Sequence, residues 1–446
     1  MAYFLAIIGG GPAGYTAAEQ ASKAGKDVVL FEQNALGGTC LNVGCIPTKS
    51  LLYGAKQYYN ATHAQRYGVT AENVSYDFSA MQRRKTIVVR KLVAGIRQRL
   101  QNEHCTIVSG AATVVSRTDT SVTIQCSGQT YEAENLLICT GSSSFIPPIP
   151  GIQDNPAVWD STVALDSKEL PASVIIIGGG VIGMEFATLY NALGIPVTII
   201  EALPRILATL DECISDYLTP VYTKRGVDIR TSTKVTAVED NTVILDSGEQ
   251  LQADKILVCV GRRANIQGLE ALTDLEYNRG AIVVDDFMRT NLKNIYAAGD
   301  VTGKIMLAHV ASRQAEVAVG RMLKQIPVQR IAYNAIPSVV YTYPEVASVG
   351  ISEGALEGCE AHTLPMTYSG RFVAENEGET GLCKLVVNTK SQAIMGVHLV
   401  GNPSSEFIAA ASFAVRMGYT LPEFRQVVFP HPTVAEILRE TVNEIQ

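Results

Sequence analysis

"FLAIIGGGPAGYTAAEQASKAGKDVVLFEQ", residues 4–33, carries the pattern that decides the fold. An apolar run leads into a glycine turn, a helix-forming segment and a second apolar run. Gly9, Gly11 and Gly14 have the G-x-G-x-x-G spacing, which permits a tight turn, close approach of a pyrophosphate, and helix–strand packing. Glu32 ends the second run, where a carboxylate can accept hydrogen bonds from ribose hydroxyls. The stretch therefore predicts a strand–turn–helix–strand unit that binds a dinucleotide.

The same arrangement recurs in residues 173–202, "SVIIIGGGVIGMEFATLYNALGIPVTIIEA". Gly178, Gly180 and Gly183 repeat the glycine spacing, and Glu201 repeats the acid. A single copy is weak evidence, but two strand-flanked copies, each with its acid, predict two dinucleotides bound by one chain. Because Glu201 would repel a 2′-phosphate, the second site is predicted to prefer NAD over NADP.

Two cysteines follow the first unit in "GGTCLNVGCIPTKS", residues 37–50. In a regular helix, residues five apart have Cα atoms about 8.6 Å apart, whereas a disulfide needs less than about 7 Å. If Cys40 and Cys45 bridge, the helical turn between them must be distorted, and Gly44 supplies the freedom for that. A zinc site would need further ligands, which are not nearby, and two unrelated buried thiols would not explain the neighbouring glycines. A redox-active disulfide is therefore predicted, with FAD in the first dinucleotide site to pass electrons to NAD in the second.

Length and composition limit the classes of protein. A chain of 446 residues predicts roughly two to four domains. The net charge is −7 and there is no basic run, so no nucleic-acid partner is expected. The N-terminal apolar run is too short for a membrane span and lacks a signal peptide's features, so no membrane association is expected. Nine cysteines without a disulfide-framework spacing favour a reducing cytoplasm, and no metal site is expected.

A histidine lies near the C-terminus in "FPHPTVAE", residues 429–436. Thiol–disulfide exchange proceeds through a thiolate. An imidazole such as that of His431 can accept the thiol proton and so accelerate the exchange. A carboxylate on the other ring nitrogen would fix the tautomer. Glu436 is a candidate for this role, but Thr433-x-x-Glu436 is also a capping box, and considered alone the cap is the stronger interpretation.

The cysteine segment resembles the active-site segment of the flavin-dependent disulfide reductases, and the resemblance covers essentially the whole chain. Four further segments are similar to motifs of that family: "LLICTGSSSFIPPIPG" (136–151), "ILVCVGRRAN" (256–265), "NIYAAGDVTG" (294–303) and "VVYTYPEVASVG" (339–350). The first and third resemble the two flavin segments, the second resembles the exit from the NAD domain, and the fourth opens a domain similar to the family's dimerisation domain.

The resemblance implies roles for the matched residues. Cys40 would exchange with the sulfur of the substrate, and Cys45 would lie against the flavin. Lys49 would approach flavin N5 and pair with Glu185 beside the nicotinamide. The residues alone leave Lys49 open to interpretation as a solvated helix residue, but Glu185 stands in the apolar run "VIGMEFATLY", where a buried carboxylate needs a partner.

Further roles follow from the same resemblance. Asp300 would hydrogen-bond the ribityl chain of the flavin. Thr140 and Gly141 would belong to the flavin site, and Gly261 to the NAD site. His431 and Glu436 would form a dyad that reaches the disulfide of the partner subunit, and the bond between His431 and Pro432 would be cis.

Four parts are predicted along the chain. Residues 1–150 form the first part of the FAD-binding domain, with a largely helical excursion from Leu51 to Leu100, and residues 151–265 form the NAD-binding domain. Residues 266–332 complete the FAD-binding domain, and residues 333–446 form the interface or dimerisation domain. The predicted fold class is α/β: two Rossmann-like dinucleotide-binding domains plus a C-terminal α+β dimerisation domain.

Within the family, the cysteine segment and "YPEVASVG" are most similar to the dihydrolipoamide dehydrogenase branch. The implied reaction is oxidation of protein-bound dihydrolipoamide with reduction of NAD⁺, in a homodimer that serves the lipoyl domain of a 2-oxo acid dehydrogenase or glycine cleavage complex. Phe429 departs from the branch, which usually carries a second histidine there. Two alternatives remain open: an NADH-dependent reductase of another small disulfide, and a non-catalytic flavoprotein redox sensor.

Overall fold

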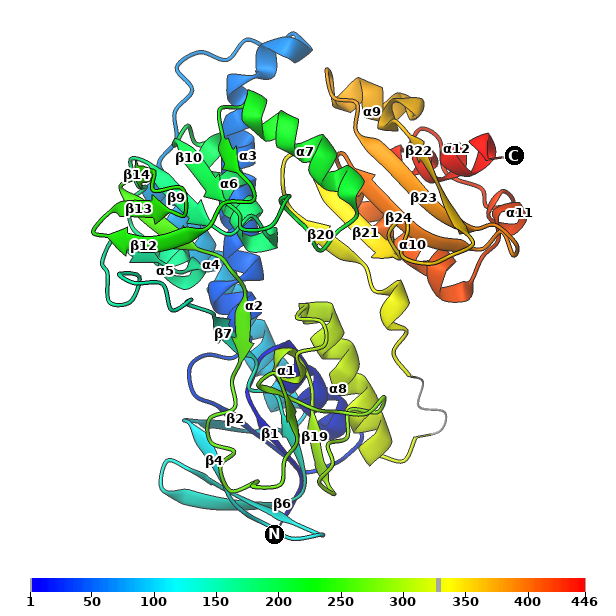
Figure 1. Cartoon of the computed structure of the whole chain (residues 1–446). Helices are drawn as coiled ribbons and strands as arrows, with labels where there is room; N and C mark the ends of the chain where they lie inside the picture. The colour runs from blue at the N-terminus through cyan, green and yellow to red at the C-terminus, as the bar shows by residue number, and fades with distance from the viewer. Residues whose placement is uncertain (1, 326–329, 446) are drawn as a thin grey trace. The chain divides into compact units, whose positions relative to one another are not determined.

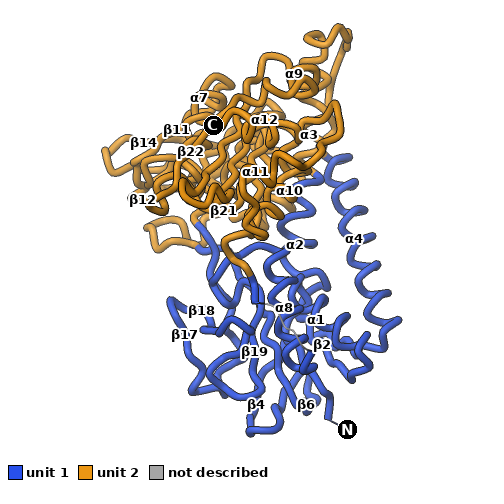
Figure 2. The backbone as a smooth tube through the Cα atoms, turned by 90° about the vertical axis from the view of Figure 1, so that its right-hand side faces the viewer, with its two compact units in different colours: residues 1–50, 79–145, 261–331 blue, residues 51–78, 146–260, 332–446 orange. Residues whose placement is uncertain are grey.

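The computed structural model describes residues 2–325 and 330–445, and Figure 1 labels many of its helices and strands. The chain forms two compact units, each assembled from three separate segments. Unit 1 comprises residues 1–50, 79–145 and 261–331, and unit 2 comprises residues 51–78, 146–260 and 332–446 (Figure 2).

Unit 1 is built around a sheet with the order β3-β2-β1-β6-β5-β4, to which β19 adds beside β6. Strands β1, β2, β3, β6 and β19 are parallel, and the pairs β6–β5 and β5–β4 are antiparallel. The central strands are buried on both faces, as expected where helices cover a parallel sheet. The strands are β1 (Tyr3–Ile8), β2 (Val28–Glu32), β3 (Thr106–Ser109), β4 (Ala112–Arg117), β5 (Val122–Cys126), β6 (Gln129–Ile138) and β19 (Ile295–Ala297).

Helices α1 and α8 pack side by side in unit 1, and both contribute small side chains to its core. Short strands β7 and β16 pair antiparallel and bring residues 142–144 beside residues 262–264. The remaining elements are α1 (Pro12–Lys23), α2 (Gly38–Val43), β7 (Ser142–Ser144), β16 (Arg262–Ala264), β17 (Tyr277–Asn278), β18 (Ala281–Ile282), η2 (Asp300–Thr302) and α8 (Ala308–Met322).

The predicted helical excursion is confirmed as two long helices, α3 (Cys45–Thr62) and α4 (Phe78–Asn102), joined through the short turn η1 (Ala64–Tyr67). Helix α3 begins in unit 1 and ends in unit 2.

Unit 2 contains a second parallel sheet, ordered β11-β10-β9-β15-β8, which repeats the strand–turn–helix–strand unit of unit 1. The meander β12-β13-β14 joins it through a shared apolar cluster. The elements are β8 (Val158–Trp159), α5 (Ser161–Asp166), β9 (Val174–Ile177), α6 (Val181–Ala192), β10 (Val197–Ile200), α7 (Glu212–Lys224), β11 (Asp228–Arg230), β12 (Val235–Glu239), β13 (Thr242–Leu245), β14 (Gln250–Gln252) and β15 (Lys255–Val258).

The C-terminal part of unit 2 is an antiparallel sheet ordered β20-β21-β24-β23-β22. Because side chains alternate along a strand, one face of this sheet packs on α10 and α12, while Lys384 and His398 point to the other face. The elements are η3 (Tyr333–Ala335), β20 (Ser338–Val340), β21 (Val346–Gly350), β22 (Cys359–Leu364), η4 (Met366–Tyr368), α9 (Gly370–Glu375), β23 (Leu382–Asn388), β24 (Ile394–Val400), α10 (Ser404–Met417), α11 (Leu421–Phe424), η5 (Val434–Glu436) and α12 (Ile437–Glu444).

None of the helices in residues 2–325 and 330–445 combines the length and apolar character that crossing a bilayer requires. The mixed α/β architecture, with two parallel nucleotide-binding-type sheets and an antiparallel C-terminal sheet, agrees with the fold class that the sequence predicts.

Candidate active site

The first glycine turn joins β1 to α1, and its three glycines differ in the reason for which glycine is needed. Gly9 has φ +105°, and an added Cβ there would lie 2.2 Å from the carbonyl oxygen of Cys139. A Cβ on Gly14 would lie 1.8 Å from the carbonyl oxygen of Gly9. A Cβ on Gly11 would meet only the Cα of Gly38, at 3.8 Å. The protein itself therefore requires the first and third glycines, whereas the second leaves a gap that fits a closely approaching dinucleotide.

The second glycine turn, between β9 and α6, has the same division. Gly178 has φ +106°, and a Cβ there would lie 2.5 Å from the carbonyl oxygen of Cys259. A Cβ on Gly183 would lie 2.0 Å from the carbonyl oxygen of Gly178, while a Cβ on Gly180 would meet nothing within 4 Å. The internal repeat predicted from the sequence is thus a repeat of backbone geometry, and both turns fit a dinucleotide.

Each turn is closed by the acid that follows it. Glu32 accepts a hydrogen bond from the N–H of Gly10 at 2.7 Å, and Glu201 accepts one from the N–H of Gly179 at 2.7 Å. Each carboxylate also accepts from the amide two residues further along the chain, at 2.7 Å and 2.8 Å respectively. A carboxylate has about four lone-pair sites, so each acid retains acceptor capacity for ribose hydroxyls.

The cysteine pair lies at a break between two helices. Helix α2 ends at Val43, Gly44 has φ −147° and ψ −112°, and α3 begins at Cys45. This is the distorted turn that the spacing requires if the two sulfurs are to bond. Both cysteines are thiols in the structure, and they lie near enough for Cys45 to raise the pKa of the Cys40 thiol. The redox-active disulfide itself stays a prediction.

The hydrogen bond to Cys45 and burial raise the pKa of the Cys40 thiol well above its ordinary value. The nearby positive charge of Lys49 opposes this rise, and the negative charge of Asp300 adds to it. The structure therefore brings these four predicted site residues of unit 1 close enough to interact. A thiol with a raised pKa needs a base to become a nucleophile.

Asp300 is oriented by two residues that were not predicted as site residues. The hydroxyl of Ser142 donates to Oδ2 of Asp300 at 2.5 Å. Arg262 in turn donates from Nε to the hydroxyl of Ser142 at 2.7 Å and from a terminal nitrogen to its carbonyl at 2.6 Å. Ser142 and Arg262 follow Gly141 and Gly261 directly in the sequence, but only the pairing of β7 with β16 brings them together.

Asn265 fastens the segment that contains Thr140 and Gly141. The hydroxyl of Thr140 donates to the carbonyl of Asn265 at 2.6 Å, and the N–H of Asn265 donates to the carbonyl of Gly141 at 3.0 Å. Gly141 and Gly261 have φ +71° and +124°, and a Cβ on either would meet nothing within 4 Å. Both glycines serve backbone conformation and leave open space beside the chain.

Glu185 lies in unit 2, on α6, and is 5% exposed. Its Oε1 accepts a hydrogen bond from the N–H of Tyr341 at 3.2 Å. The buried carboxylate thus has a backbone partner in the segment after β20. Its pairing with Lys49, which belongs to unit 1, stays a prediction.

His431 and Glu436 lie together in unit 2. Nδ1 of His431 is 3.1 Å from Oε1 of Glu436, while Oε2 of Glu436 accepts from the N–H of Thr433 at 2.8 Å in a capping box. The sequence left open whether Glu436 orients His431 or caps the helix. In the structure its carboxylate makes both contacts. Because a carboxylate only accepts, Nδ1 of His431 carries the hydrogen in this contact.

The imidazole of His431 is 80% exposed, whereas the Glu436 side chain is 7% exposed. The hydrogen bond from Thr433 and the contact with His431 hold the pKa of Glu436 below its ordinary value, against the opposing effect of burial. The bond between His431 and Pro432 is cis, as the family resemblance implies. Phe429, at the position of the family's second histidine, packs its ring 5.8 Å from that of Phe424.

The other seven cysteines are wholly or partly buried. Four are buried and three are partly buried, as small apolar side chains would be. No group of three or more His, Cys, Asp or Glu side chains within the described ranges 2–325 and 330–445 is arranged to hold a metal ion.

Comparison with known proteins identifies the family. Residues 3–315 match the family model described as pyridine nucleotide-disulphide oxidoreductase, and residues 336–442 match the model of its dimerisation domain. A curated relative, dihydrolipoyl dehydrogenase from Chlamydia pneumoniae, is 36% identical over 446 residues, covering 97% of this chain and 95% of the relative.

Two solved structures are similar along their whole length. The HOCl-induced flavoprotein disulfide reductase RclA from Escherichia coli has a TM-score of 0.87 and 30% identity, with 100% of both chains covered. LpdA from Mycobacterium tuberculosis has a TM-score of 0.91 and 25% identity, covering 99% of this chain and 100% of that one. With both family models matched and the relatives similar end to end, the chain belongs to the pyridine nucleotide-disulphide oxidoreductase family.

Proposed function

We propose that the protein oxidises dihydrolipoamide to lipoamide and reduces NAD⁺, using FAD and a redox-active pair, Cys40 and Cys45. The observation that carries the reaction class is the placement of these two thiols on either side of the helix break at Gly44, near enough for Cys45 to raise the pKa of Cys40. The choice of substrate is supported by relatives at 36% identity that are named dihydrolipoyl dehydrogenase. The alternative reductase has weaker support, from the flavoprotein disulfide reductase RclA at 30% identity.

FAD would occupy the first glycine turn and NAD the second. Bound FAD would supply a two-electron carrier between the thiols and the nicotinamide. The residues that would hold FAD are Gly9, Gly11, Gly14, Glu32, Lys49, Thr140, Gly141 and Asp300. The residues that would hold NAD are Gly178, Gly180, Gly183, Glu201 and Gly261, with Glu185 beside the nicotinamide and paired with Lys49. The open spaces at Gly11 and Gly180 support this assignment.

The sulfur chemistry would proceed by two exchanges at Cys40. One thiolate of dihydrolipoamide attacks Cys40 of the disulfide, forming a mixed disulfide and releasing Cys45 as a thiolate. The second substrate thiolate then attacks the substrate's own sulfur, closing lipoamide and releasing Cys40. The substrate loses two electrons and two protons. The cysteine pair receives the two electrons, which finally leave on NAD⁺ as hydride, and one proton goes to solvent.

His431 would accept the proton of the attacking thiol, and Glu436 would keep the imidazole in the tautomer that exposes Nε2. The hydrogen bond from Nδ1 to Glu436 supports this role, since it leaves Nε2 as the acceptor. The exposed imidazole face supports the idea that His431 acts on the disulfide of a partner subunit in a homodimer.

The proposal also covers the domains of the chain, its oligomeric state, its partner and its location. The FAD-binding domain would comprise residues 1–150 and 266–332, the NAD-binding domain residues 151–265 and the dimerisation domain residues 333–446. The match of residues 336–442 to a dimerisation-domain model supports the homodimer. The partner would be the lipoyl domain of a 2-oxo acid dehydrogenase or glycine cleavage complex, in the cytoplasm, where thiols remain reduced.

Steady-state kinetics tests the proposal directly. Formation of NADH or NADPH is measured with dihydrolipoamide or reduced glutathione as the donor, and with NAD⁺ or NADP⁺, respectively, as the acceptor. Sustained turnover is expected only with dihydrolipoamide and NAD⁺, with the other pairings at least about tenfold slower in kcat/KM. Turnover with glutathione instead would favour the alternative reductase, and a single reduction without turnover would favour the sensor.

A further inference from the structure

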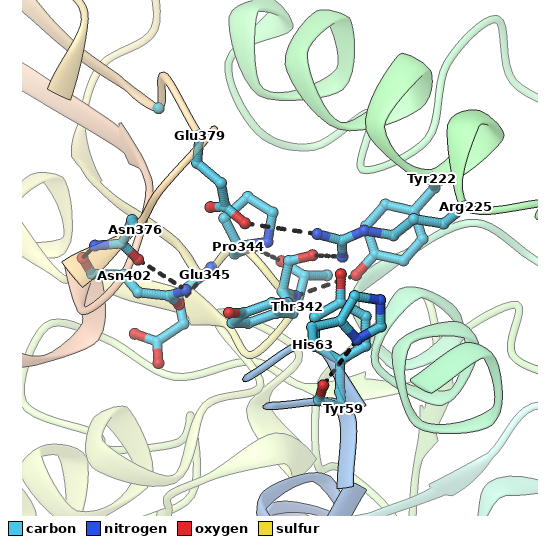
Figure 3. Close-up of polar contacts among 12 residues, drawn as sticks. Tyr59, His63, Tyr222, Arg225, Thr342, Pro344, Glu345, Asn376, Glu379 and Asn402 are labelled. Carbon is cyan, nitrogen blue, oxygen red and sulfur yellow. Dashed lines mark hydrogen bonds and ion pairs between the residues drawn. The ribbon is translucent and has the colours of Figure 1, made fainter. Parts of the chain in front are cut away.

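Side chains from other parts of unit 2 hydrogen-bond to the backbone of the segment from Tyr341 to Pro344, between β20 and β21. The N–H of Tyr341 donates to Glu185 at 3.2 Å, and the N–H of Tyr343 donates to the hydroxyl of Tyr222 at 3.1 Å. Arg225 donates to the carbonyl of Tyr343. Figure 3 shows Tyr222, in the last turn of α7, and Arg225, the C-cap residue of that helix, directed at this segment. Both backbone groups of Tyr343 therefore depend on one end of one helix.

The same helix end is tied to α6, the helix that carries Glu185. The hydroxyl of Tyr222 is 2.6 Å from the hydroxyl of Thr188, which donates to the carbonyl of Met184 at 2.7 Å. Glu185 and Thr188 are three residues apart and lie on one helix face. The segment thus contacts that face twice: directly at Glu185 and through Tyr222 at Thr188.

Arg225 is the charged centre of this cluster. Its guanidinium lies 5.4, 5.7 and 5.2 Å from the ring centroids of Tyr59, Tyr222 and Tyr343. A terminal nitrogen is 3.6 Å from Oε1 of Glu379, and the Arg225 side chain is only 19% exposed. A guanidinium held among rings, a carboxylate and a carbonyl is restricted to one orientation, which a flexible apolar side chain would not reproduce.

Loss of the Arg225 guanidinium would remove the ion-pair partner of Glu379 and the donor to the Tyr343 carbonyl. Oε2 of Glu379 is already buried without a hydrogen-bond partner in the structure. Burial raises the pKa of Glu379, and the charges of Arg225, Arg66 and Lys56 oppose that rise. Lys56 also lies 5.3 Å from the Tyr343 ring centroid and 3.9 Å from Glu345. Without Arg225, the Tyr343 carbonyl would lose its charged donor and the segment would lose its fixed register against α6.

We propose that Arg225 is a positioning residue that holds the Tyr341–Pro344 segment, and through the N–H of Tyr341 orients the Glu185 carboxylate for reaction at the nicotinamide. This inference rests on the role of Glu185 in the proposed function. Arg225 and the three tyrosine rings around it would thus serve the nicotinamide half of the reaction, because they contact the segment that hydrogen-bonds to Glu185. Substitution of Arg225 should have little effect on thiol–disulfide exchange at the cysteines.

The test compares Arg225→Met and Arg225→Lys with Arg371→Met. Arg371 forms an exposed ion pair with Glu375 in the same unit, so its variant controls for loss of a guanidinium. Rapid kinetics measures reduction of the purified holoenzyme by dihydrolipoamide and, separately, by NADH. NADH fluorescence gives the dissociation constant. Reduction by NADH involves no dithiol, so it tests Arg225 even if dihydrolipoamide proves not to be the substrate.

We expect Arg225→Met to slow reduction by NADH about tenfold or more, to weaken NADH binding by a smaller factor, and to leave reduction by dihydrolipoamide within about twofold. Arg225→Lys should recover part of the loss, and Arg371→Met should resemble the wild type. Equal slowing of both reductions, or no change in either, would overturn the proposal. If Arg225→Met does not fold, Tyr222→Phe replaces it, since this variant removes the hydroxyl that bridges Tyr343 and Thr188. Tyr222→Phe should show the same selective slowing of reduction by NADH, and a wild-type rate in this variant would overturn the proposal as well.

Discussion

Nζ of Lys384 lies 2.9 Å from Oδ1 of Asp211, and the two side chains are 7% and 2% exposed. Asp211 is the N-cap of α7, and Lys384 lies on β23 of the antiparallel sheet. Oδ2 of Asp211 also accepts from the N–H of Glu353 at 3.0 Å. A fully buried ion pair thus joins two parts of unit 2 that are separated by more than 150 residues of sequence.

Replacing Asp211 with Asn should lower the free energy of unfolding by about 3 kcal/mol, because the buried Lys384 ammonium then keeps only the exposed carboxylate of Glu353 as a counter-charge. Urea unfolding followed by circular dichroism measures the change. The double variant Asp211→Asn, Lys384→Met should recover a large part of it, since no unpaired charge is then buried. If the double variant is as unstable as the single one, the loss comes from the helix cap and not from the ion pair.

Asp211 should also make stability depend on pH in acid. Although burial opposes ionisation, hydrogen bonds from Cys213, Glu353 and Lys384 hold the pKa of Asp211 below its ordinary value. A carboxyl with a lowered pKa in the folded state binds a proton less readily than in the unfolded chain. Its stabilisation is complete above the unfolded value of about 3.9 and is lost as the pH falls through the folded pKa. Urea unfolding from pH 6 to pH 3 should show a steeper loss in wild type than in Asp211→Asn, and equal slopes would contradict this assignment.

Replacement of Cys40 by Ser should reduce dihydrolipoamide oxidation by more than about 10³-fold, because no sulfur remains to form the mixed disulfide. Cys359→Ser, which removes a thiol on β22 well away in sequence, is the matched control and should retain wild-type rates. Thiol titration under denaturing conditions, before and after reduction with NADH, should show two additional thiols in wild type and none in Cys40→Ser. Two additional thiols in both would place the redox pair elsewhere.

Glu436 makes two contacts, and amide substitution separates them. Gln at this position keeps an oxygen that accepts from the N–H of Thr433, so the melting temperature should change little. The negative charge that steadies the imidazolium of His431 is lost, and dithiol oxidation should fall about 10²-fold. Glu436→Ala removes both contacts and should lower activity and melting temperature together. Unchanged turnover in Glu436→Gln would leave the residue as a helix cap alone.

The sequence predicts the parts of the site that depend on local spacing. Both glycine turns, their acids and the helix break at Gly44 follow from patterns a few residues long, because sterics within one turn set them. Asn265, Ser142 and Arg262 were missed because their contacts depend on the pairing of β7 with β16, more than 110 residues apart. The Tyr341–Glu185 contact spans 156 residues and uses a backbone N–H, which leaves no signal in the identity of the side chain.

The second and third glycines of the second turn, Gly180 and Gly183, give the sharpest test of a nucleotide site. A methyl group on Gly180 would meet no protein atom within 4 Å, so Gly180→Ala should fold with wild-type stability. If the NAD⁺ pyrophosphate occupies that space, its dissociation constant should rise about tenfold or more, while reduction by dihydrolipoamide stays unchanged.

Gly183→Ala should behave in the opposite way, because its methyl group would lie 2.0 Å from the carbonyl oxygen of Gly178 and force α6 away from β9. Its expected effect is a loss of about 3 kcal/mol in unfolding free energy, with NAD⁺ binding lost only as a consequence. Titration of each variant with NAD⁺, alongside its thermal unfolding curve, separates the two effects. Wild-type affinity in a stable Gly180→Ala variant would show that the pyrophosphate does not approach this turn, because the added methyl group has no other neighbour to avoid.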